Sequence, residues 1–269
     1  MRVLPSVLML ALLSLPIVTA AEENSVVAIV FGRSVSASEI LPSPTIAKAK
    51  KKELKEPEYQ QWLAQDRVRL LTGLIEEELL NHYARQNHLE PSEDDLAAYR
   101  RMDQRMNDEE RDREDQQVRE FSAKLLSPSS SEAERATASN EIARIERRRT
   151  IREFGNKNVG DEFRKRHEAW THATIQHWNV SRSLFGKYGG RVLLSSFGFH
   201  VPIDALMKFL KECRLAEQFQ IPDPELEAAF WRHAGDDHWG DGKLTEQEAQ
   251  HLFDDPPWRT AETNSPPAP

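Results

Sequence analysis

Apolar side chains recur at steps of three and four residues between Tyr59 and His88, which is the spacing of one face of an α-helix. This is the strongest helical pattern in the chain. A stripe of this length exceeds what one small β-hairpin can cover, so it must either pack against helices predicted between residues 161 and 233 or stay partly available to other molecules. Its apolar positions are Trp62, Leu63, Val68, Leu70, Leu71, Leu74, Ile75, Leu79, Leu80 and Tyr83.

A β-hairpin is predicted ahead of this helix. The run Val26–Phe31 is β-branched and apolar, which is typical of a strand, and Gly32-Arg33 can form the turn before a short return strand. Ser36 or Ser38 could then cap a short helix.

The remaining sequence also predicts mostly helix. Residues 100–119 are highly charged, contain no Gly or Pro, and place opposite charges three and four residues apart. This pattern favours an exposed helix stabilised by ion pairs over a disordered segment. The predicted fold class is therefore mainly α, with long amphipathic helices and a small N-terminal β-hairpin. Further helices are expected at residues 132–154, 161–183, 203–215, 225–233 and 246–253, with a short strand at 191–197.

These patterns divide the chain into four predicted segments. Residues 1–20 form a leader, 21–126 a helical domain, 132–254 a helical C-terminal region, and 255–269 a Pro-rich tail in which Trp258 could dock. The loop at Leu126–Ser131 separates the two helical regions. The sequence leaves open whether these regions are separate domains or share one core.

The leader has the pattern of a secretory signal peptide. A basic Met1-Arg2 precedes the apolar run Val3–Val18, and Val18-Thr-Ala20 places small residues before a cleavage site. We therefore expect a periplasmic or secreted protein, cleaved after Ala20, without a stable membrane span after cleavage. The net charge of −8 disfavours a nucleic-acid partner. Cys213 is the only cysteine, so an intrachain disulfide is excluded.

Two stretches together carry a resemblance to a known family. The run Val26–Val35, followed by Glu39-Ile40, resembles the start of the SurA-type periplasmic chaperones, where a strand of the form V-V-A-x-V-N-G precedes an apolar residue and a helix. Residues 74–80 and 83–95 resemble the long helix of that family, its exit and the next helix start. Phe31 and His88 replace the usual Asn and Gly. The resemblance covers roughly residues 24–100 and implies a SurA N-terminal-like fold.

The resemblance implies that the protein holds unfolded or nascent envelope proteins without a cofactor. The apolar stripe of the long helix would then supply the peptide contacts, and the candidate residues are Trp62, Leu70, Leu74, Leu79 and Tyr83. Related proteins often carry a parvulin-type prolyl isomerase domain, so a divergent isomerase is one alternative. Gly189-Gly190 is the only turn comparable to that domain, and the rest of its pattern is missing.

A second alternative is a calcium-binding protein. Residues 237–248 can be aligned to an EF-hand loop, with Asp237, Asp241 and Glu248 as carboxylate ligands and Lys243 contributing its carbonyl. Trp239 stands at the third position and supplies no oxygen, so the loop is degenerate. The competing interpretation is a glycine turn between two helices, with Thr245 capping the second helix.

Overall fold

The computed structural model describes residues 25–158, 160–194, 200–235 and 242–259. The predicted leader and the last ten residues of the tail lie outside these ranges. The contacts divide the chain into two units: unit 1 is residues 1–79 with 210–236, and unit 2 is residues 80–209 with 237–269. Each unit therefore combines segments from both sides of the loop at 126–131. None of the helices in the described ranges has the length and hydrophobicity needed to cross a bilayer.

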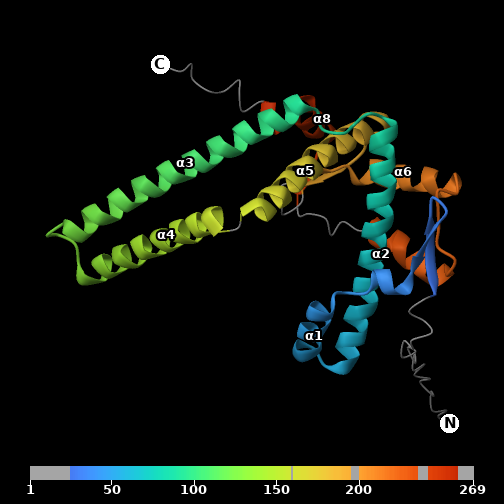
Figure 1. Cartoon of the computed structure of the whole chain (residues 1–269), viewed down its shortest axis with the longest axis horizontal. Coiled ribbons are helices and arrows are strands. Elements are labelled where there is room, and N and C mark those ends of the chain that lie inside the picture. Colours follow the sequence, from blue (N-terminus) through green and yellow to red (C-terminus); the bar gives the residue numbers. More distant parts are fainter. Residues whose placement is uncertain (1–24, 159, 195–199, 236–241, 260–269) are drawn as a thin grey trace, which may run out of the picture. The chain divides into compact units, whose positions relative to one another are not determined.

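Unit 1 combines an N-terminal hairpin with helices from both ends of the sequence (Figure 1). It contains β1 (Val26–Val30), β2 (Arg33–Ser36), the short 3-10 helix η1 (Ala37–Ile40), α1 (Pro44–Glu53), α2 (Glu56–Gln86) as far as Leu79, α6 (Ile203–Leu215) from Leu210, β5 (Phe219–Gln220) and α7 (Pro224–Ala234).

The predicted hairpin is confirmed, with its turn one residue earlier than expected. β1 pairs antiparallel with β2 so that Val30 faces Arg33, and Phe31 and Gly32 form the two-residue turn with φ of 48° and 79°. Positive φ at both positions matches the twist of a tight hairpin, although it is unusual for a phenylalanine. The Phe31 amide donates to the Gln218 carbonyl at 2.8 Å, which extends the antiparallel pairing of β1 with β5 and holds the turn in place.

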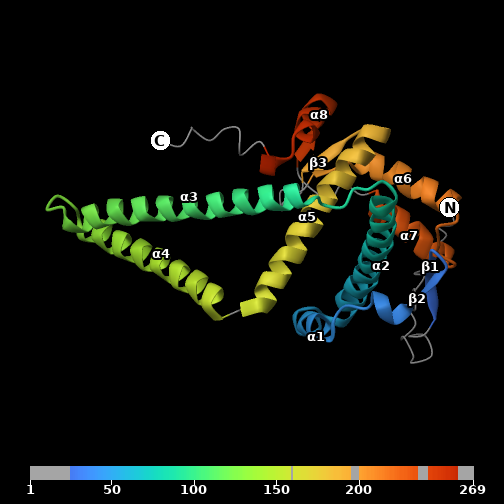
Figure 2. The same ribbon diagram turned by 45° about the horizontal axis from the view of Figure 1, so that its top comes forward.

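Unit 2 is built largely from three long helices. It contains the end of α2 from Leu80, α3 (Glu93–Leu126), α4 (Glu132–Asn158), α5 (Gly160–Tyr188), β3 (Val192–Leu194), β4 (His200–Val201), α6 as far as Phe209, β6 (Gly242–Leu244) and α8 (Glu246–Asp254). The charged run at 100–119 is helical, as predicted, because it lies within α3. α3 and α4 form a helical hairpin (Figures 1 and 2), and β3 is the central strand of an antiparallel sheet with β4 and β6.

An aromatic core closes one part of unit 2. Tyr99 of α3, Trp178 and Phe185 of α5, and Phe253 of α8 pack with Trp258, which is only 2% exposed. The Trp258 indole donates to the Asp95 carboxylate at 3.1 Å, and Arg259 pairs with the same carboxylate at 2.7 Å. The first residues of the predicted tail are therefore part of the core.

Candidate functional site

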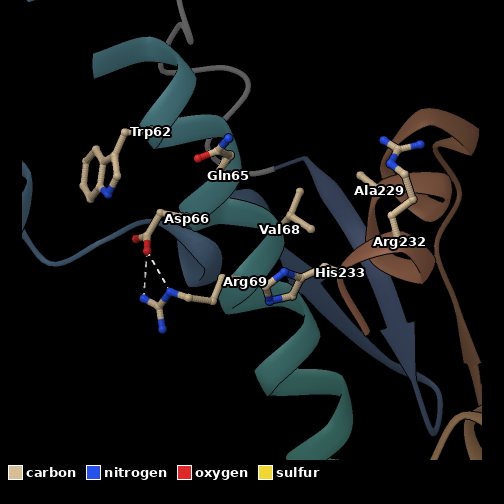
Figure 3. Close-up of a pocket in the computed structure, with 8 residues that line it drawn as sticks. All are labelled: Trp62, Gln65, Asp66, Val68, Arg69, Ala229, Arg232 and His233. Carbon is tan, nitrogen blue, oxygen red and sulfur yellow. Dashed lines mark hydrogen bonds and ion pairs between the residues drawn. The ribbon is translucent and has the colours of Figure 1, made fainter. Parts of the chain in front are cut away.

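An open groove of about 720 Å³ lies between α2 and α7 of unit 1 (Figure 3). The helix α2 contributes its N-terminal half, and α7 contributes its last two turns. Side chains of several kinds line it: an indole, aliphatic groups, an ion pair, a second arginine and an imidazole. The lining residues are Trp62, Gln65, Asp66, Val68, Arg69, Ala229, Arg232 and His233.

The position of α7 is set by its N-terminal cap and its buried face. Asp223 caps the helix by accepting from the amides of Glu225 and Leu226, and Pro224 occupies its first turn. Phe230 is fully buried, with its ring centre 5.5 Å from that of Phe219. Ala229 and Arg232 stand on either side of Phe230 in the sequence, on positions that the core does not cover, so they can line the groove.

A salt bridge joins the first turn of α7 to the end of α6. Arg214 Nε donates to Glu227 Oε1 at 2.8 Å. The pKa of the Glu227 carboxyl is lowered, chiefly by this hydrogen bond, against the opposing effect of burial. α7 is thus held at its capped first turn, at its buried face and by this ion pair, which makes it a fixed wall of the groove.

The wall from α2 has an apolar part and a charged part. The indole of Trp62 is half-buried and lies against the ring of Tyr59, with 5.7 Å between ring centres, and Val68 is also half-buried. Arg69 Nε donates to Asp66 Oδ1 at 2.8 Å, one helical turn away. The Asp66 side chain is 10% exposed and that of Arg69 is 58% exposed, so the arginine presents more surface to solvent than its partner.

The arrangement is chemically suited to binding. Apolar surface from Trp62, Val68 and Ala229 lies in the same groove as hydrogen-bond donors from Gln65 and Arg232. Binding sites for peptides and other organic ligands combine an apolar lining with a few polar groups in this way.

The structure disperses the five residues predicted to bind peptide. Trp62 lines the groove. Leu70 and Leu74 are half-buried on the following turns of α2, and neither is among the lining residues. Leu79 is 1% exposed and belongs to the core, so it offers no accessible surface.

Tyr83 belongs to unit 2, although it lies on the same helix. Its hydroxyl is 2.9 Å from Ser183 Oγ, and its ring meets Phe209 edge-on with 5.1 Å between ring centres. These contacts tie the end of α2 to α5 and α6. Tyr83 is thus part of the packing of unit 2, whereas Trp62 lines the groove of unit 1.

The lining residues that the sequence did not single out come from both helices: Gln65, Asp66 and Arg69 from α2, and Ala229, Arg232 and His233 from α7. Ala229, Arg232 and His233 are spaced by three and four residues, as neighbours on one helical face are. That spacing is present in the sequence, but it does not show which of the other helices α7 faces. On α2, Asp66 and Arg69 are two of several charged residues between the apolar positions, and the sequence does not distinguish them from the others.

The predicted calcium loop is only partly within the described residues. Asp237 and Asp241 lie outside them, and Lys243 belongs to strand β6, opposite Leu193 of β3. Glu248 accepts hydrogen bonds from the Thr245 amide at 2.8 Å and the Thr245 hydroxyl at 2.7 Å, which closes a capping box at the start of α8. These bonds, the amide first, lower the pKa of the Glu248 carboxyl. Across the described part of the chain, no three metal-ligating side chains converge.

Comparisons with known proteins add no family to this picture. No protein-family model, no curated protein and no solved structure matches the chain.

Proposed function

We propose that this protein is an exported, SurA-like chaperone that holds apolar segments of unfolded or nascent envelope proteins in the groove between α2 and α7. The observation that carries the proposal is the open groove of about 720 Å³, whose lining includes the half-buried side chains of Trp62 and Val68. An aromatic side chain that is fixed by its neighbours can contact a client at a small entropic cost. The secretory pattern of residues 1–20 supports export, and the resemblance of residues 24–100 supports the kind of client.

The groove also agrees with binding that does not depend on one client sequence. The groove is lined by side chains of two helices and not by an exposed strand edge. A client therefore need not align its backbone hydrogen bonds in a particular register. Gln65 can donate and accept hydrogen bonds, and can therefore satisfy the backbone of a bound segment.

The experiment compares two matched variants. Trp62→Glu places a charge in the groove, whereas Ile46→Glu makes the same kind of change at a side chain that is 51% exposed on α1, outside the groove. Light scattering of a refolding envelope protein should show that the wild type and Ile46→Glu slow aggregation, and that Trp62→Glu protects at least threefold less. Circular dichroism melts verify that both variants fold.

Full protection by a folded Trp62→Glu variant would contradict the proposal. A proline-limited refolding assay separates holding from the isomerase alternative. A holding protein leaves that phase at the uncatalysed tens to hundreds of seconds, whereas an isomerase shortens it. Clear acceleration without protection from aggregation would favour the enzyme.

A further inference from the structure

Arg232 is the cation of the groove that has no anionic partner among the residues the structure describes. It lines the groove and is exposed, whereas Arg69 is engaged with Asp66 at 2.8 Å. The positions three and four residues before Arg232 on α7 are Ala229 and Ala228, so the preceding turn supplies no carboxylate either. The guanidinium is therefore available to a bound molecule.

The charge of the groove is opposite to that of the chain. Its described lining contains two arginines and one aspartate, which leaves one positive charge with His233 neutral, while the whole chain carries −8. A local cationic site in an acidic protein attracts anionic groups selectively, because the rest of the surface repels them. Among such groups a carboxylate matches the planar fork of a guanidinium, which can donate two parallel hydrogen bonds to it.

We propose that the groove selects polypeptide segments in which a carboxylate stands close to a bulky apolar side chain. The inference rests on the proposed function and names the class of segment held. Val68 and Ala229, which face each other across the groove (Figure 3), take the apolar side chain, and Arg232 takes the carboxylate. A segment carrying a lysine in place of the acid would meet both arginines, and the mostly covered Asp66 offers it little compensation.

The test uses short peptides of one apolar sequence with a central phenylalanine. The residues beside the phenylalanine are Glu, Gln or Lys, both termini are blocked, and each peptide carries a neutral dye. A fourth peptide has the Gln sequence with a free C-terminal carboxylate. Fluorescence anisotropy at low ionic strength should give a Kd roughly fivefold lower for the Glu peptide than for the Gln peptide, with the Lys peptide weakest.

Two variants locate the effect. Arg232→Gln should remove the preference for Glu over Gln, so that the Glu and Gln peptides bind it with equal Kd. Lys211→Gln is the matched control, since it removes the same charge from an exposed position on α6 of unit 1 that does not line the groove. It should retain the fivefold preference.

The outcomes separate this inference from the proposed function. Equal affinities of the Glu and Gln peptides in the wild type, or a preference that survives Arg232→Gln, would overturn the selection of carboxylates but leave peptide holding intact. If no peptide binds, the proposed function itself fails. Tighter binding of the fourth peptide than of its blocked counterpart, lost in Arg232→Gln, would support the inference with the chain terminus as the source of the carboxylate.

Discussion

Two glutamates on the long helices are almost completely buried, and their surroundings are opposite. Glu76 on α2 in unit 1 is 7% exposed, and its Oε1 has no hydrogen-bond partner in the described structure. Glu114 on α3 in unit 2 is 3% exposed and contacts arginines of α4: Arg149 at 3.2 Å and Arg152 at 3.1 Å. The Glu76 carboxyl is therefore buried with an oxygen that accepts no hydrogen bond, whereas the Glu114 carboxyl is covered by arginines that neutralise its charge.

The pKa values follow from this difference. Burial raises the pKa of Glu76 to about 8, since removal from water disfavours the charged form. Burial also acts to raise the pKa of Glu114, but the hydrogen bonds from Arg149 and Arg152 outweigh it and the pKa is lowered. Low exposure alone therefore does not decide whether a buried carboxyl is charged. What covers the carboxyl decides it, and the two sites should respond to mutation and pH in opposite directions.

The largest effect is expected from Glu76→Gln at alkaline pH. The folded-state pKa of about 8 lies above the ordinary value of 4.5, so the folded protein holds a proton that the unfolded chain releases, and the wild type loses stability as the pH rises from 4.5 through 8. Glutamine cannot ionise and escapes this loss. The variant should be more stable than the wild type on the order of 4 kcal/mol at pH 9, and nearly equal to it at pH 4.

Urea unfolding at the two pH values measures this difference. Glu77→Gln is the matched control, because Glu77 is the next residue of α2 and is exposed. It should change stability little at either pH. A Glu76→Gln variant that shows the same stability difference at pH 4 and pH 9 would mean that the buried carboxyl ionises without cost.

Glu114→Gln should have the opposite sign and a smaller size. The substitution leaves Arg149 and Arg152 without the carboxylate on which they converge, and we expect the α3–α4 hairpin to lose about 2 kcal/mol at neutral pH. The lowered folded-state pKa means that this stabilisation is present above the ordinary pKa of 4.5 and is lost as the pH falls through the folded value. The wild type and the variant should therefore converge in acid.

Hydrogen exchange of the α3 and α4 amides measures the effect where it arises. Asp112→Asn removes a neighbouring exposed charge on α3 and serves as the control. If both variants exchange alike at neutral pH, the arginines do not depend on Glu114.

The sequence predicted the secondary structure of both regions better than it predicted these environments. Helical periodicity and the absence of Gly and Pro correctly predicted helix at 59–88 and 100–119. The charges of the second helix were expected to pair within it. Instead Glu114 pairs with α4, about 35 residues later, because a hairpin brings the basic run Arg147–Arg149 alongside. Periodicity describes one helix and does not indicate which face its neighbour covers.

The same limit applies to the groove. The apolar stripe of α2 contains both Trp62 and Leu79, yet the first lines an open groove and the second is buried. The two positions differ because other segments cover α2 around Leu79 more completely than around Trp62. Arg232 stands on α7, more than 150 residues after the α2 residues that line the same groove. No local sequence pattern can therefore show that it belongs to the groove.

The smallest effect should come from Arg148, which sharpens the account of Glu114. Arg148 Nε lies 3.6 Å from the Glu114 carboxylate and its side chain is 43% exposed, whereas Arg152 lies at 3.1 Å and is 24% exposed. The Arg148 guanidinium is exposed and lies at the longer distance, so its attraction to Glu114 is largely screened by water and salt, and Arg148→Gln should cost no more than about 0.3 kcal/mol, and nothing in 1 M salt. Arg152→Gln should cost roughly three times as much, because it also loses its contact with Glu110 at 3.1 Å. Exchange of the same α3 and α4 amides compares the two. Equal losses would mean that Glu114 is stabilised by the summed positive charge of α4, and unequal losses that it is stabilised by the individual hydrogen bonds.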